Sequence, residues 1–139
     1  MIKEFKTSLT KRQTQAWALL TDDYDQEILY GGAKGGGKSY LLCLWVGYWA
    51  MWLAEFWKIE KSDTPLLVGF FGRKQGTDFE KTTLETFKRI WPNKAYRIRE
   101  KAREIVFDDR VKVLYGGLDD QERIEKFNSA EFAFHALDQ

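Results

Sequence analysis

The sequence predicts an α/β fold in which a mostly parallel β-sheet lies between helices. Strand-like and helix-like segments alternate along the chain, as they do in sheets of parallel strands. A glycine-rich loop separates a strand pattern from a long apolar helix pattern, and residues 66–71 form the continuous apolar run of a strand covered on both faces. With 139 residues, 44% of them hydrophobic, the chain suffices for one domain with a core.

The composition excludes several classes of protein. Cys43 is the only cysteine and His135 the only histidine, so an internal disulfide and a Cys/His zinc cluster are both excluded, and a reducing compartment is expected. A net charge of +1 excludes binding to nucleic acid or membrane through bulk charge. Residues 40–54 carry no charge but fall short of the ~20 residues that span a bilayer, which predicts a buried helix and no membrane partner.

Start and stop signals and hydrophobic periods define the elements of the first half of the chain. The expected elements are a helix at 10–20, a strand at 27–30, the glycine loop at 31–37, an apolar helix from 39 to about 58, a turn at 62–65 and the strand at 66–71. A strand, a glycine loop and a helix in this order are typical of a phosphate-binding unit.

The second half begins with a helix from Thr77, because Phe79, Thr83, Phe87 and Trp91 recur every four residues until Pro92 ends the pattern. A hairpin insertion, a short helix and a last strand follow. They are the strands 104–107 and 111–115, a helix capped by Asp119 or Asp120 that runs through Phe127, and residues 131–138 with an acid at the end. Since such a strand normally leads into further elements, we expect the chain to be truncated.

The glycine loop satisfies the pattern G-x-x-x-x-G-K-[ST] of a P-loop (Walker A motif). Its residues are Gly32, Ala33, Lys34, Gly35, Gly36, Gly37, Lys38 and Ser39, with Tyr40 directly after them. Glycines let backbone N–H groups wrap a phosphate chain, and the following helix points its positive end at the same anion. Lys38 would contact the β- and γ-phosphates and Ser39 would ligate Mg²⁺. The alternative is a flexible glycine linker.

An acid at the end of a neighbouring strand would complete such a site by holding the Mg²⁺, and Asp138 is the candidate. The alternative is an ordinary Asp in a turn. Gln139 stands where many P-loop ATPases have the glutamate that activates water. An amide orients water but cannot accept its proton, so hydrolysis by this chain is an open question.

With these motifs the chain resembles the N-terminal ATPase half of bacteriophage terminase large subunits, the DNA-packaging motors of tailed phages. The segments that carry the resemblance are 9–13, 30–39 with the Trp-rich helix after it, 72–74, 116–118 and 132–138. The resemblance implies a P-loop NTPase of the RecA-like (ASCE) type. Residues 1–25 would then be an adenine-side helical segment and 27–139 the core up to the Walker B strand, without the C-terminal nuclease domain.

The resemblance also implies the activity. The protein would be an ATP-hydrolysing motor subunit that uses Mg²⁺ and translocates double-stranded DNA into a procapsid, in the cytoplasm of the host cell. Its partners would be the portal protein, the small terminase subunit and further copies in a ring, and any nuclease activity would belong to the missing domain. The alternatives are a nucleotide-binding module or fragment that does not hydrolyse, and a helicase-type ATPase.

Two residues of the site receive roles from the resemblance. Lys34 stands where the family usually has an arginine that senses the γ-phosphate, although lysine lacks the planar fork for bidentate contact; the alternative is a solvated lysine. Gln13 matches the family's adenine-binding segment. Yet Thr10-x-x-Gln13 is also a capping box, in which the amide reaches back to the helix start, and both interpretations stay open.

Basic residues gather between Gly72 and Arg103, with ten Lys and Arg against four acids. Arg97, Arg99, Lys101 and Arg103 alternate, so an extended strand would present all four on one side, either to DNA or another subunit or as a solvated face balanced by acids. Arg73 is a further candidate for a DNA or trans contact. We interpret His135 as a hydrogen-bonded core residue, Cys43 as buried and inert, and the Trp and Tyr residues of the apolar helix as buried all round it.

Overall fold

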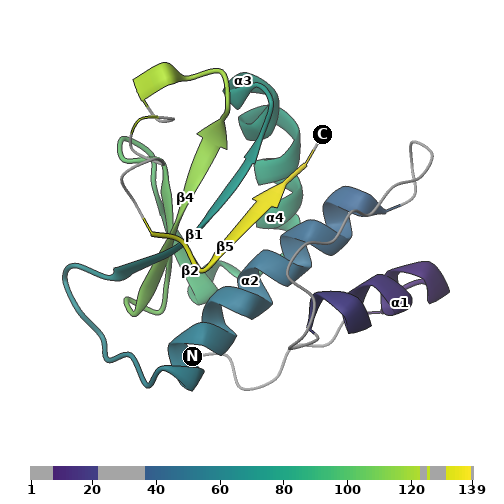
Figure 1. Cartoon of the computed structure of the whole chain (residues 1–139), viewed down its shortest axis with the longest axis horizontal. Helices are drawn as coiled ribbons and strands as arrows, with labels where there is room; N and C mark the ends of the chain where they lie inside the picture. The colour runs from purple at the N-terminus through teal and green to yellow at the C-terminus, as the bar shows by residue number, and fades with distance from the viewer. Residues whose placement is uncertain (1–7, 22–36, 123–124, 126–130, 139) are drawn as a thin grey trace.

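The computed structural model describes residues 8–21, 37–122, 125 and 131–138. The helices are α1 (Lys11–Leu20), α2 (Lys38–Phe56), α3 (Gly76–Asp78) and α4 (Leu84–Ile90), with a π-helical segment η1 (Phe79–Thr83) and a short 3-10 helix η2 (Asn93–Ala95). The strands are β1 (Leu66–Arg73), β2 (Tyr96–Arg99), β3 (Glu104–Phe107), β4 (Val111–Gly117) and β5 (Phe134–Leu137). The α/β fold class is confirmed (Figure 1). The strand expected at 27–30 lies outside the described residues, as does most of the helix expected after Asp120.

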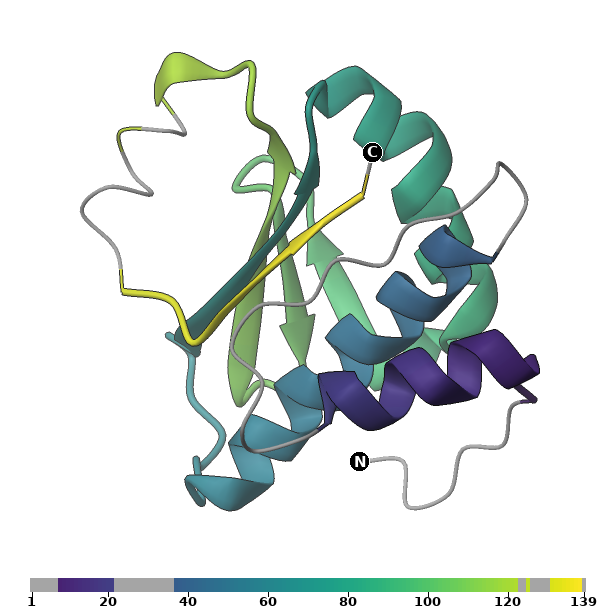
Figure 2. The same cartoon turned by 45° about the vertical axis from the view of Figure 1, so that its right-hand side comes forward.

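The five strands form one sheet in the order β2-β3-β4-β1-β5. β1 is parallel to both of its neighbours: residues 66–73 pair with 111–117 of β4, and residues 69–72 pair with 134–137 of β5. Figure 2 shows β5 lying alongside β1. The carboxyl ends of β1, β4 and β5 therefore meet at one edge, where open α/β sheets place their ligands.

The expectation of a mostly parallel sheet holds in part, because the described sheet is mixed and only β4, β1 and β5 are parallel. β2 pairs antiparallel with β3, and β3 pairs antiparallel with β4. Only four residues separate β2 from β3 and only three separate β3 from β4, and connections this short permit antiparallel pairing alone. The predicted hairpin is confirmed, and it extends the sheet as continuous strands.

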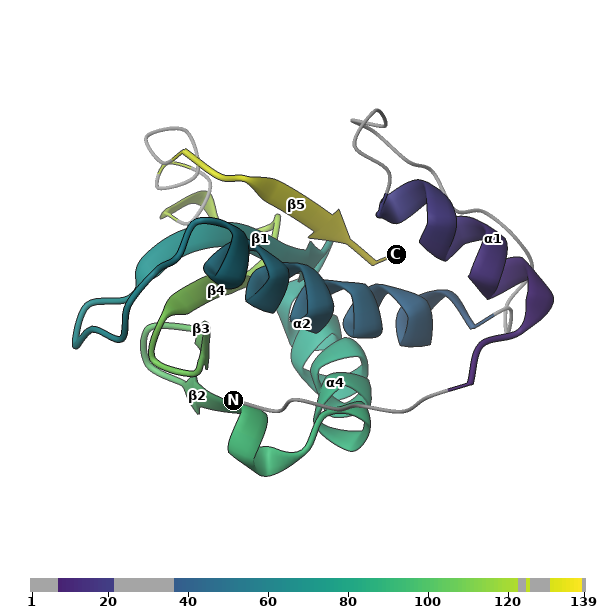
Figure 3. The ribbon, with the colours of Figure 1, turned by 90° about the horizontal axis from the view of Figure 1, so that it is seen from below.

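One hydrophobic cluster joins α2, η1 and α4 to a face of the sheet. Its fully buried members include Cys43 and Val46 of α2, Phe79 of η1, Phe87 of α4 and Phe71 of β1. α2 and α4 lie side by side in Figures 1 and 3. This packing fixes the start of α2, and therefore Ser39, relative to the end of the sheet.

The helix predicted from Thr77 to Trp91 is confirmed, with an interruption that the sequence did not predict. Its middle, η1, is π-helical: the N–H of Leu84 bonds to the carbonyl of Phe79, five residues earlier. In an α-helix positions four apart drift round the axis, since a turn holds 3.6 residues. The wider turn keeps Phe79 and Thr83 on the same buried face, and both are 0% exposed.

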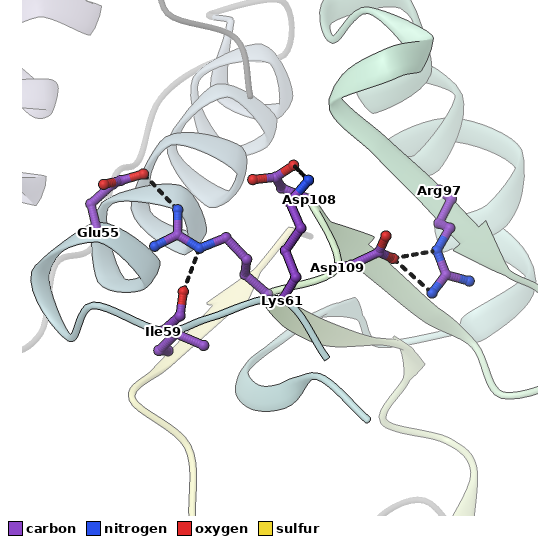
Figure 4. A network of polar contacts seen from close by, with 7 residues as sticks. Glu55, Ile59, Lys61, Arg97, Asp108 and Asp109 are labelled. Carbon is purple, nitrogen blue, oxygen red and sulfur yellow. Dashed lines mark hydrogen bonds and ion pairs between the residues drawn. The ribbon is translucent and has the colours of Figure 1, made fainter. Parts of the chain in front are cut away.

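The tip of the β3–β4 hairpin holds the end of α2. Arg110 donates to the carbonyls of Ile59 at 2.6 Å and Ala54 at 2.8 Å, and to Glu55 Oε1 at 2.5 Å. These bonds satisfy carbonyls at a helix C-terminus, where a positive charge is also favourable. Figure 4 shows Glu55 and Ile59 beside this tip, with Arg97 paired to Asp109 on its other side.

Two expectations about burial are wrong. β5 alternates, so Phe134 and Ala136 face the core while His135 is exposed, because the described part of the chain covers one face of this strand. The aromatic residues of α2 are not all buried either. Trp45 is buried, whereas Tyr48 is 40% exposed and Trp57, directly after α2, is 46% exposed. In the part of the chain that the structure describes, no helix combines the length and apolar character needed to cross a membrane.

Candidate functional site

The candidate site lies where the carboxyl end of β5 meets the start of α2. Asp138 directly follows β5, and its N–H donates to the carbonyl of Gly72 at 2.8 Å, which continues the pairing of β5 with β1 by one step. In Figures 1 and 3 the arrow of β5 points toward the side of the molecule where α2 begins. Backbone pairing therefore delivers this carboxylate, which is only 7% exposed, to the end of the sheet.

Two hydroxyl groups donate to the same oxygen of Asp138. Ser39 Oγ lies 2.7 Å from Asp138 Oδ2, and Thr83 Oγ1 lies 2.7 Å from the same atom. Burial of a carboxylate is costly unless such bonds compensate for lost water. Ser39 of α2, Thr83 of η1 and Asp138 directly after β5 thus form a polar cluster in which Thr83 and Asp138 are buried and Ser39 is half-buried.

Ser39 and Asp138, predicted separately as residues that hold Mg²⁺, are joined by a direct hydrogen bond although they are 99 positions apart. A serine hydroxyl has one hydrogen and two lone pairs. Because the hydrogen goes to Asp138, the lone pairs of Ser39 Oγ remain available to accept a hydrogen bond or to ligate a cation.

The start of α2 depends on a glycine in the left-handed region. Gly37 has φ +74° and precedes the first helical residue, Lys38. Its carbonyl accepts hydrogen bonds from the N–H of Leu41 at 3.0 Å and from Gln13 Nε2 at 3.0 Å. A Cβ at this position would stand 2.2 Å from Gln13 Nε2, so a side chain here would strain the backbone and displace the Gln13 amide.

Gln13 takes part in the capping box that the sequence permitted. Its Oε1 accepts from the N–H of Thr10 at 2.9 Å, and its own N–H donates to Thr10 Oγ1 at 3.2 Å. The bond from Nε2 to Gly37 was not expected, and it ties α1 to the end of the glycine loop. Gln13 is 5% exposed, and the role in adenine binding stays a prediction.

Cys43 lies one helical turn beyond Ser39, on the same side of α2. Its thiol donates to the carbonyl of Thr83 at a distance of 3.4 Å. Burial raises the pKa of the Cys43 thiol far above its ordinary value, and the negative charge of Asp138 raises it further. The thiol is therefore protonated and unreactive at neutral pH, as its interpretation as a buried residue requires.

The remaining site residues are only partly described. Lys38, Ser39 and Tyr40 are half-buried at the start of α2. Gly32, Ala33, Lys34, Gly35, Gly36 and Gln139 lie outside the described residues. In the described ranges no three His, Cys, Asp or Glu side chains gather as a possible metal-binding group. Ser39 and Asp138 are oxygen donors that could hold a cation at this point.

The expectation that one strand presents all four alternating basic residues is wrong. β2 ends at Arg99, and residues 100–103 form a turn in which Arg103 has φ +54°. Each of the three arginines is within ion-pair distance of an acid. The pairs are Arg97–Asp109 at 2.9 Å, Arg99–Glu104 at 3.9 Å and Arg103–Asp120 at 3.1 Å. The turn reverses the chain, which is what places Glu104 opposite Arg99.

Arg73 ends β1 at the same edge of the sheet as Asp138. Its Nη1 donates to Thr82 Oγ1 at 2.5 Å, and that hydroxyl donates to the carbonyl of Asp78 at 2.6 Å. Adjacent threonines of η1 therefore contact the ends of neighbouring strands, Thr82 on the side of β1 and Thr83 on the side of β5. A role of Arg73 toward DNA or a second subunit stays a prediction.

Thr83 is the site residue that sequence reasoning missed. The four-residue repeat places Thr83 on the same helix face as Phe79 and Phe87, among apolar side chains. A polar residue on a buried helix face requires a partner, and this was the available signal. The partner itself, 55 positions away, follows only from the topology.

Comparison of the chain with protein-family models, with curated proteins and with solved structures gave no match.

Proposed function

We propose that the protein binds a nucleoside triphosphate with Mg²⁺ at the start of α2 and hydrolyses it as a P-loop ATPase of the RecA-like type. The observation that carries this proposal is the hydrogen bond of 2.7 Å from Ser39 to Asp138. It joins the last residue of the glycine-loop motif to an acid at the end of a parallel strand, the two oxygen donors that such a site needs.

These donors fit Mg²⁺, which prefers oxygen ligands and keeps several of its waters, so that one or two protein ligands suffice beside phosphate oxygens. Ser39 would hold the cation through a lone pair, and Asp138 would hold it directly or through water. When bound, the cation neutralises charge on the phosphates.

The other roles belong to residues of the chain itself. The N–H groups of the glycine loop and the positive end of α2 would bind the phosphates, and Lys38 would place its ammonium against the β- and γ-phosphates. Lys34 would add a second charge. Gln13 supports the loop through Gly37, and its remaining amide hydrogen is the group that would face adenine.

The proposed biological role is that of a DNA-packaging motor subunit, and the resemblance of the motifs to terminase large subunits supports it. Double-stranded DNA, a ring of identical subunits, the portal protein and the small terminase subunit would be its partners. Stimulation of ATP hydrolysis by double-stranded DNA tests this role. Equal rates with and without DNA in the assembled motor would contradict it.

Substitution of Lys38 tests the nucleotide site. We expect Lys38→Ala to lower ATP affinity by at least about tenfold, because charge-assisted hydrogen bonds to phosphate are lost. Lys94→Ala is the matched control, since Lys94 is an exposed lysine in η2. Affinity is measured by isothermal titration with Mg·ATP. Equal affinities of the Lys38 variant and the wild-type protein would contradict the proposed site.

A second candidate function is nucleotide binding without hydrolysis, and Gln139 favours it, because an amide cannot act as a general base. Phosphate release separates the two. Binding of Mg·ATP without release of phosphate, followed by release in the Gln139→Glu variant, would identify the amide as the cause. Release by the wild-type chain would exclude the second candidate.

A further inference from the structure

The proposed site contains one polar group that the glycine-loop motif and the strand-terminal acid leave unexplained, the hydroxyl of Thr83. Thr83 is 0% exposed, and its Oγ1 donates to Asp138 Oδ2 at 2.7 Å. Its neighbours on the same helix face are the buried rings of Phe79 and Phe87. A hydroxyl in such surroundings is tolerated because it has this partner.

The backbone around Thr83 is fixed as well. The carbonyl of Thr83 accepts a hydrogen bond from the thiol of Cys43. The π turn that ends at Thr83 is closed by a hydrogen bond from the N–H of Leu84 to the carbonyl of Phe79. Single π turns within helices are rare and occur frequently at functional sites. Here the turn ends at Thr83, whose hydroxyl contacts the carboxylate that directly follows β5.

We propose that Thr83 is a positioning residue that holds the carboxylate of Asp138 in the orientation required for binding Mg·nucleotide. This inference rests on the proposed function. Thr83 and Ser39 both donate to Oδ2, which restrains rotation of the carboxylate. Among the described residues none donates a hydrogen bond to Oδ1, so this oxygen is the one that would face the cation or its water.

The test compares ATP affinity with Mg²⁺ and with EDTA in three variants. Thr83→Val removes the hydroxyl at nearly constant shape, and Thr83→Ser keeps it. Thr82→Val is the matched control, because Thr82 carries the adjacent hydroxyl of η1 and contacts Arg73 instead of Asp138. We expect Thr83→Val to weaken binding about 10- to 100-fold with Mg²⁺ and to leave binding in EDTA unchanged. Both other variants should resemble the wild type.

If Thr83→Val weakens ATP binding equally in Mg²⁺ and in EDTA, the inference is overturned, because a structural defect in the loop has the same effect. It is also overturned if ATP binding by Thr83→Val depends on Mg²⁺ as strongly as binding by the wild type. If the valine variant does not fold, Thr83→Ala takes its place. A double-mutant cycle of Thr83→Ala and Asp138→Asn then measures the coupling energy of the Thr83–Asp138 hydrogen bond. The cycle uses unfolding midpoints in the absence of nucleotide. A cycle without coupling overturns the inference. A wild-type protein that binds no nucleotide overturns the proposed function as well, which distinguishes the two failures.

Discussion

Gly37 shows how much one residue determines at this site. It lies in the left-handed region with φ +74°, and its missing Cβ makes room for the Gln13 amide. We expect Gly37→Ala to lower the free energy of unfolding by about 2–4 kcal/mol, from the left-handed backbone and from displacement of Gln13. Urea unfolding followed by circular dichroism measures this loss.

The backbone cost and the cost of displacing Gln13 can be separated by repeating the substitution in a Gln13→Ala variant. In a chain that already carries Gln13→Ala, the clash is absent, so Gly37→Ala should cost only the backbone term of about 1–2 kcal/mol. Equal losses in both backgrounds would show that the Gln13 contact contributes nothing to the start of α2.

Cys43 predicts a dependence of stability on pH. Burial, and then Asp138, raises the thiol pKa in the folded protein above its ordinary value of 9.0, so the folded state keeps a proton that the unfolded state loses. The contribution to stability is complete below pH 9 and decreases above it, by up to about 1.4 kcal/mol per pH unit. Urea midpoints of the wild type and Cys43→Ala at pH 8, 9 and 10 measure it. Parallel pH profiles of the two proteins would refute the prediction.

At the scale of elements, α2 is held at both ends by residues distant in sequence. Arg110, whose side chain is 13% exposed, contacts two carbonyls and Glu55 at the C-terminal end. We expect Arg110→Ala to cost about 2–3 kcal/mol and Arg110→Lys to recover only part of it, because lysine lacks the planar fork.

Arg97→Ala provides the matched control on the adjacent strand. Arg97 pairs with Asp109, but both side chains are more than half exposed, so its loss should cost less than about 1 kcal/mol. Both variants are compared by urea unfolding. Equal losses would mean that the bonds to the α2 carbonyls add nothing beyond a surface ion pair.

Sequence patterns predicted the elements well where a single local cause determines them. The capping box of Thr10 and Gln13, one of the two roles left open for Gln13, begins α1, and the polar residues 108–110 turn the hairpin as expected. The patterns failed where distant contacts decide. The π turn serves the packing of Phe79 and Thr83, and residues 100–103 turn the chain so that β3 pairs with β2, which brings Glu104 opposite Arg99. Alternation of charge alone does not reveal either contact.

At the scale of the whole molecule, topology brings the site together. Ser39 and Asp138 were predictable as separate candidates, because a motif and a strand end mark them. Their meeting with Thr83 requires that β5 pair with β1 and that α2 and α4 pack against the same sheet face. These are long-range contacts, which no local pattern in one sequence specifies.

The pairing of β5 with β1 therefore governs the site from a distance, and Gly69 makes it testable. A Cβ on Gly69 would stand 2.4 Å from Phe134 Cζ, in the first pair of the β1–β5 register. We expect Gly69→Ala to displace β5, to lower the free energy of unfolding by about 1–3 kcal/mol and to weaken Mg·ATP binding through movement of Asp138.

The control combines Gly69→Ala with Phe134→Leu. The smaller leucine side chain should restore part of the stability and part of the Mg·ATP affinity, whereas Phe134→Leu alone should lower the stability. Calorimetric unfolding and Mg·ATP titration of the three variants measure these effects. If Gly69→Ala lowers stability but leaves Mg·ATP affinity unchanged, the position of Asp138 does not depend on the pairing of β5 with β1. Asp138 directly follows β5, so displacement of this strand should change the two quantities together.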